Sequence, residues 1–307
     1  MNCTHLVRFP ALARLLVAST VLAAVSLSAQ PAAPTSAAAP KAPPVPRLPV
    51  PAASPLGTLK QRVGLTDIEI VYARPGAKGR TMLGNIEPYG KVWRTGANAA
   101  TTVAFSTAVK LEGRDVPAGK YALFTIPGEK EWTVIISKDA EQSGAFEYKE
   151  SDDLVRFTVK PVKLSVPVET LEFTINDIRG DSATLNLSWE TTRVPVRLTL
   201  DVVGPTVAKI KEMMAAEGRK PFAAAAGFYF DNKLDLAQAL IWIDASIAEG
   251  ANQTNTHLKA KILAGLGRKA EAITAANQSI ELALKSPNAG IQQEYTKMNQ
   301  NLIKSLK

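Results

Sequence analysis

Short segments in which apolar and polar residues alternate run from about residue 57 to residue 202, and they constrain the fold more than any other feature. In the first segment, Ile68, Ile70 and Tyr72 alternate with Asp67 and Glu69. A period of two residues is that of a strand with one buried face. Similar runs occupy residues 101–106, 121–126, 132–137, 154–159, 169–178, 183–189 and 194–200.

Turn signals built from Gly, Pro and Asp separate these runs, and no helical pattern intervenes. We therefore predict an antiparallel β-sandwich of jelly-roll-like type over residues 56–203. The tight Gly180-Asp181 turn signal predicts a hairpin between the runs at 169–178 and 183–189.

Residues 204–307 have a different character, because alanine becomes dense and the alternating runs end at Gly204-Pro205. Residues 235–247 repeat as residues 268–280, at a constant offset of 33 residues. Ala239 thus matches Ala272. This period is typical of helix–turn–helix units such as tetratricopeptide repeats.

We predict a helical, tetratricopeptide-like tail over residues 204–307. Gly267 is expected to end one helix before the next begins near Glu271. Because about two repeats are too few to fold alone, we expect the sandwich or a further helix at 291–306 to cap them.

The N-terminal segment has the pattern of a cleavable secretory signal peptide over residues 1–29. Arg8 and Arg14 precede an uncharged apolar run at 15–27, and small residues follow that run. We expect cleavage near Ala29–Gln30, with Ser28 as the rival position. The alternative is a membrane-anchored N-terminus, which the short run disfavours.

Residues 30–55 are rich in Pro and Ala and carry almost no charge, so we predict an extended, disordered linker there. No later run is apolar enough to span a bilayer, so we expect no transmembrane span after cleavage. These features predict export to the periplasm, the cell surface or the extracellular medium. The lack of any cysteine after Cys3 fits a bacterial envelope protein without disulfides.

Several strings within the strand-rich region are specific. They include Ile70-Val-Tyr-Ala-Arg-Pro75 and Tyr89-Gly-Lys-Val-Trp-Arg-Thr-Gly-Ala-Asn98, followed by Pro117-Ala-Gly-Lys-Tyr121. Over about residues 54–200 the chain resembles the bacterial family known as domain of unknown function 2911. The resemblance implies an exported protein, in some members with a helical extension. It implies no activity and supplies no catalytic residues.

The composition excludes several kinds of chemistry. His257 is the only histidine after the predicted cleavage site, and the sequence after that site contains no cysteine. A catalytic triad in the sandwich and a Cys- or His-based metal site are therefore not expected, and we predict no metal and no cofactor. His257 itself is expected on the surface of a helix. The net charge of +8 is spread along the chain, so we predict no nucleic-acid partner.

One cluster of cationic and aromatic residues suggests a binding site. Arginine binds carboxylate or phosphate in bidentate fashion, and aromatic rings stack on sugars or cations. If the loops converge, these residues would bind an anionic or glycan ligand of the envelope. Alternatively, they pack over the sheet and support the fold. The candidate residues are Tyr72, Arg74, Lys78, Arg80, Trp93, Arg94 and Asn98.

The leading hypothesis is therefore a ligand- or partner-binding envelope module, and the sequence leaves enzymatic activity open. The first alternative is a hydrolase that cleaves an envelope glycan with two carboxylates. The second is a structural protein that binds a protein partner through the helical tail. The carboxylates available to a hydrolase are Asp67, Glu69, Glu87, Asp115, Glu169, Glu172 and Glu190.

Overall fold

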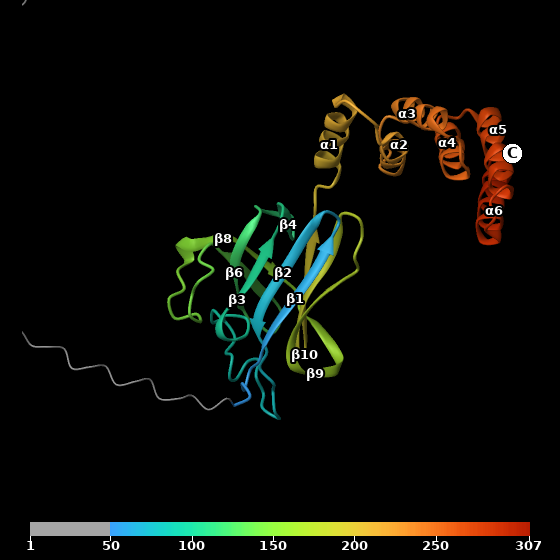
Figure 1. Ribbon diagram of the computed structural model, residues 1–307. Coiled ribbons are helices and arrows are strands. Elements are labelled where there is room, and N and C mark those ends of the chain that lie inside the picture. Colours follow the sequence, from blue (N-terminus) through green and yellow to red (C-terminus); the bar gives the residue numbers. More distant parts are fainter. Residues whose placement is uncertain (1–49) are drawn as a thin grey trace, which may run out of the picture. The chain divides into compact units, whose positions relative to one another are not determined.

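The computed structural model describes residues 50–307 (Figure 1). The predicted signal peptide (1–29) lies outside the described residues, as does most of the predicted linker (30–55).

Two antiparallel sheets make up the first part of the described chain, which confirms the predicted β fold. The larger sheet has the strand order β1-β2-β3-β6-β7-β8. Its strands are β1 (Leu56–Val63), β2 (Thr66–Ala73), β3 (Ala97–Phe105), β6 (Gly119–Ile126), β7 (Trp132–Ser137) and β8 (Asp153–Val159). The smaller sheet has the order β5-β4-β10-β9. Its strands are β5 (Arg114–Val116), β4 (Val109–Leu111), β10 (Ser182–Thr199) and β9 (Val162–Asn176).

The core forms between the two sheets because each strand buries alternate side chains. In β2, Ile68, Ile70 and Tyr72 are buried, while Asp67 is exposed on the opposite face. Apolar residues from both sheets join in a single cluster. Burial of this apolar surface is the main force that holds the sandwich together.

Two predictions about strands need correction. The runs predicted at 183–189 and 194–200 are one long strand, β10, which the register shifts near Glu190 bend without ending it. Three further strands, β1, β4 and β5, were not predicted. β4 and β5 are only three residues long, and β1 is an edge strand whose side chains are mostly solvent-accessible. The predicted hairpin is confirmed, because β9 and β10 pair across residues 177–181.

Six helices follow the sheets, which confirms the helical tail (Figure 1). They are α1 (Val203–Ala215), α2 (Phe222–Asp231), α3 (Leu236–Glu249), α4 (Gln253–Gly265), α5 (Lys269–Leu284) and α6 (Ala289–Leu306). Ala239 of α3 and Ala272 of α5 are both fully buried, as expected for equivalent positions of a repeat. The assignment to tetratricopeptide repeats remains a prediction.

The helix boundaries in the tail have local causes. Gly267 has a φ of 75° just beyond α4, a left-handed conformation that glycine adopts without strain. The side chain of Asn288 accepts hydrogen bonds from the first turn of α6. No helix within residues 50–307 is long and apolar enough to cross a membrane.

His257 is not a surface residue, so that expectation was wrong. It is buried on α4, and its Nδ1 lies 2.8 Å from Oδ1 of Asn299 on α6. The amide nitrogen of Asn299 donates to Ser279 and to the carbonyl of Tyr295. Oδ1 is therefore the acceptor, and His257 carries a proton on Nδ1. Burial lowers the pKa of His257.

Candidate functional site

The two aromatic residues of the predicted site belong to the core. Tyr72 is buried, and its hydroxyl accepts a hydrogen bond from the backbone N–H of Phe173 at 3.1 Å. Trp93 is buried as well, and its indole N–H donates to the carbonyl of Gly96. Both rings thus pack between the sheets, and Trp93 offers no free face for stacking because it lies against Trp189.

Three of the predicted cations support the loop that follows β2. Nε of Arg74 donates to the carbonyl of Leu171 at 3.1 Å. The guanidinium of Arg80 donates to the carbonyls of Gly76 and Ala77, both at 3.0 Å. Lys78 is exposed, and its backbone N–H donates to a carboxylate of the smaller sheet. These contacts fix the loop, and Arg74 and Arg80 line none of the cavities described below.

Tyr72 and Asn98 are both among the residues that line a groove on the larger sheet, which we call the sheet groove, although the ring of Tyr72 packs in the core. The volume of the groove is about 280 Å³. Asn98 is exposed at the start of β3 with a φ of 61°, a left-handed conformation that Asn tolerates better than most residues. The groove is lined by residues of β2, β3 and β6 and of the loop after β7, among them Tyr72, Ala97, Asn98, Ala100, Thr102, Lys120, Glu141 and Gln142.

Gln142 is the most unusual residue of the sheet groove. The residue is 4% exposed, and neither its amide oxygen nor its amide nitrogen has a hydrogen-bond partner among the described residues. An unsatisfied buried polar group costs roughly 1–3 kcal/mol. The backbone carbonyl of Gln142 accepts from the N–H of Ala100 at 3.3 Å, which fixes this segment on the sheet. No sequence pattern pointed to Gln142, because its burial depends on the fold of the loop.

Arg94 is the predicted cation that borders the same loop. Its Nε is buried and lacks a partner within the described chain. Its Nη1 lies 3.7 Å from the position that a Cβ on Gly144 would occupy, two residues beyond Gln142. Partial burial raises the pKa of Glu87, and the positive charge of Arg94 opposes this shift.

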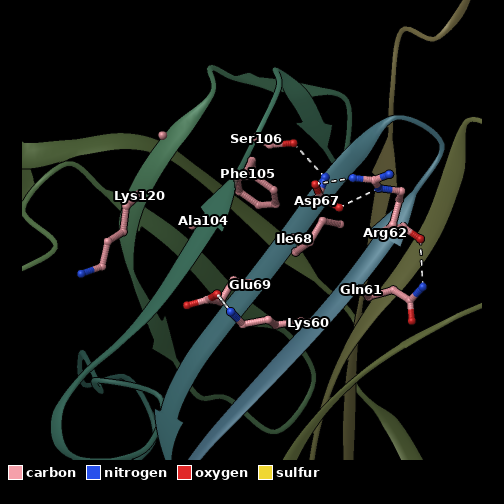
Figure 2. A pocket seen from close by; sticks show the side chains of 11 residues that line it. Lys60, Gln61, Arg62, Asp67, Ile68, Glu69, Ala104, Phe105, Ser106 and Lys120 are labelled. Carbon is pink, nitrogen blue, oxygen red and sulfur yellow. Dashed lines mark hydrogen bonds and ion pairs between the residues drawn. The ribbon is translucent and has the colours of Figure 1, made fainter.

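A second and larger hollow lies on the same sheet, with a volume of about 580 Å³ (Figure 2). Its charges are paired across neighbouring strands. Lys60 lies 2.6 Å from Glu69, and Arg62 donates two hydrogen bonds of 2.7 Å to Asp67. These bonds from Arg62 lower the pKa of Asp67. Asp67 and Glu69, the two carboxylates of β2, thus each form an exposed ion pair with a cation of β1 rather than a pair of catalytic acids.

Lys120 connects the two hollows, because it lines both of them. In Figure 2 its side chain extends away from the paired charges of β1 and β2. Its amino group lies 3.3 Å from the carboxylate of Glu141, and both side chains are more than half exposed. Such an exposed pair contributes little stability, so Lys120 remains available to a ligand.

Glu169 and Glu190 are the predicted acids that share a cavity, which has a volume of about 430 Å³. The carboxylate of Glu190 accepts the backbone N–H groups of Met82 and Leu83 at 3.0 and 2.9 Å. The carboxylate of Glu169 accepts the N–H of Lys78 at 2.7 Å. Both acids therefore hold the loop between β2 and β3 against the smaller sheet.

The described part of the chain contains no group of three or more His, Cys, Asp or Glu residues placed to bind a metal ion. The polar groups of the sheet groove are instead two amides, three hydroxyls, an amine and one carboxylate. This set suits hydrogen bonding to a polar organic ligand.

Comparison with known proteins gives one match. Residues 54–198 match the family described as "Protein of unknown function (DUF2911)". No curated protein matches the chain, and no solved structure matches it.

Proposed function

We propose that the chain, whose residues 54–198 match the DUF2911 family of unknown function, is an exported binding protein of the cell envelope. Its β-sandwich binds a small polar ligand, anionic or glycan in nature, in the sheet groove. The proposal of export depends on the sequence of residues 1–29, which has the pattern of a signal peptide.

The observation that carries this proposal is the unsatisfied amide of Gln142 at the sheet groove. Buried polar groups in proteins nearly always have a partner, so an exception beside a cavity needs an explanation, which a bound ligand would supply. The groove adds polar groups from Asn98, Thr102 and Lys120, and alanines are common among its other lining residues. Its volume of about 280 Å³ lies just below the usual range for small-molecule sites, which suits a ligand of one or two building blocks.

A second candidate is a hydrolase, favoured by the single cavity that Glu169 and Glu190 share. Paired carboxylates are the usual catalytic groups of glycosidases. Both acids already accept backbone hydrogen bonds from the loop, which is the reason why binding is the first proposal. Replacing either acid with Gln and assaying release of sugar from envelope glycans tests this candidate.

A thermal-shift screen tests the binding function directly. Ligand at 100 times its Kd stabilises a protein by about 2.7 kcal/mol, and each kcal/mol shifts the Tm by about 2–4 °C in a protein of this size. We expect envelope sugars or small anions to raise the Tm, and Asn98→Ala to reduce the shift. Lys60→Ala, which changes only the neighbouring hollow, is the matched control. If every compound leaves the Tm unchanged, the proposal is wrong.

A further inference from the structure

Two side chains beside the loop after β7 have buried polar atoms without partners in the described chain: the amide of Gln142 and Nε of the half-buried Arg94. From this arrangement we propose that the sheet groove binds the carboxyl-terminal end of a short peptide. Gln142 pairs with the main chain of its last residue, and Arg94 pairs with its carboxylate. This inference rests on the proposed binding function and specifies its ligand.

The chemistry of Gln142 favours a peptide. Both its amide oxygen and its amide nitrogen need a partner, so the ligand must present a donor and an acceptor together. In an extended peptide, the N–H and C=O of one residue point in the same direction, as in an antiparallel ladder. The last residue of a peptide therefore offers Gln142 an N–H donor and a carboxylate acceptor at once.

Arg94 supplies the complementary charge. A guanidinium binds a carboxylate through two parallel hydrogen bonds, and Nε is one of the donors that such a pair can use. Within the described residues no salt bridge joins Arg94 to an acid. Its positive charge acts at longer range on Glu87, where it opposes the rise in pKa that burial causes. The guanidinium lies beside Gly144, so it borders the same short segment as Gln142.

The surroundings limit the size of the peptide. The groove has a volume of about 280 Å³, which leaves room for a short peptide with small side chains only. Phe146, beyond Gly144, is 92% exposed and offers an apolar surface next to the site. The unpartnered atoms of Gln142 and Arg94 are buried, so a ligand reaches them only when residues 140–144 shift. Such a shift breaks the exposed Lys120–Glu141 pair, which contributes little stability, and the 3.3 Å bond from Ala100 to the carbonyl of Gln142.

Isothermal titration calorimetry of the protein with four probes tests the inference. The probes are N-acetyl-alanyl-alanine, the same dipeptide with an amidated carboxyl terminus, N-acetylglucosamine and acetate. We expect the free dipeptide to bind, the amidated dipeptide to bind at least 10-fold more weakly, and acetate alone to show no measurable binding.

Two variants assign the roles. Gln142→Met removes both unsatisfied atoms while keeping a similar volume, so the Tm should stay equal or rise while the affinity for the dipeptide falls at least 10-fold. Arg94→Lys keeps the charge but loses the planar donors, so it should reduce the preference for the free carboxylate over the amide. Arg62→Lys in the neighbouring hollow is the control and should leave both properties unchanged.

The outcomes separate this inference from the binding function itself. Binding of N-acetylglucosamine without binding of the dipeptide would overturn the inference and leave the binding function standing. Equal affinity for the free and the amidated dipeptide would overturn the role of Arg94. A Gln142→Met variant that binds the dipeptide normally would also overturn the inference, because the site would then lie elsewhere.

Discussion

The indole ring of Trp93 stacks on the indole ring of Trp189, with the ring centroids 5.7 Å apart and the planes 13° apart. Trp93 lies in the loop before β3, and Trp189 lies in β10 of the smaller sheet. Trp132 of β7 meets Trp93 edge to face at 6.3 Å. The three rings therefore join the loop to both sheets at the centre of the core.

Removing this stack should destabilise the sandwich. Trp93→Ala should lower the free energy of unfolding by about 3–5 kcal/mol, because it deletes a buried aromatic ring and leaves a cavity. Denaturation with urea measures the change. Tyr89→Ala, at a half-exposed position in the same loop before β3, is the control and should change stability far less. A Trp93→Ala protein as stable as the parent would show that the loop does not support the core.

Glu190 should stabilise the loop between β2 and β3. Glu190→Gln leaves one carbonyl oxygen to accept the two backbone N–H groups of Met82 and Leu83, and it removes the charge that strengthens both bonds. We expect a loss of about 1–3 kcal/mol and faster proteolysis within residues 77–90. Glu131→Gln, at an exposed position, is the control. Unchanged proteolysis would mean that the loop is held by other contacts.

The helical tail should lose stability in mild acid because of His257. Burial lowers its pKa in the folded state, and the charge of the nearby Lys261 acts in the same direction. The unfolded state therefore binds the proton more readily. The contribution of His257 is present above its unfolded pKa of about 6.5 and is lost as the pH falls through the folded pKa.

His257→Gln provides the matched comparison for this pH effect, since Gln can still donate to Asn299 without titrating. Circular dichroism of the helices during urea unfolding at pH 7.5 and pH 5 measures the effect. The parent protein should lose more stability between these two values than the variant. Equal losses would assign the acid sensitivity to other groups.

Tyr148 should make the larger sheet sensitive to alkaline pH. Burial and, to a smaller extent, the hydrogen bond to Asp153 together raise its pKa to about 12. The folded state thus retains the phenolic proton more strongly than the unfolded state does. The stability from this group is present below about pH 10 and is lost as the pH rises towards 12.

Ultraviolet difference spectroscopy of tyrosine ionisation checks this value. The parent protein should show a late-titrating tyrosine that is missing in Tyr148→Phe and still present in Tyr89→Phe. If Tyr148→Phe leaves the late component in place, the raised pKa belongs to another tyrosine.

The alternating pattern of the strands and the alanine-rich repeat determined the order of the parts, because both patterns are local. Ile68 and Ile70 face the core because alternate side chains of a strand point to the same face of the sheet, as the two-residue period predicts. The same reasoning divided β10 in two, since a bulge at Glu190 interrupts the pattern while the hydrogen bonds of the strand continue. It also placed His257 on the surface, because the pattern of α4 alone does not show that α6 covers it.

The sequence alone also grouped Arg74, Arg80, Arg94 and Asn98 by their proximity along the chain. Only the tertiary structure decided that Arg74 and Arg80 bind main-chain carbonyls, while Asn98 lines a groove. Gln142, the residue on which the proposed site depends, lies far along the sequence from residues 74–98. Composition and period fix which side chains are buried within one element. Which buried polar group finds a partner depends on contacts between distant segments, and only the folded chain determines these.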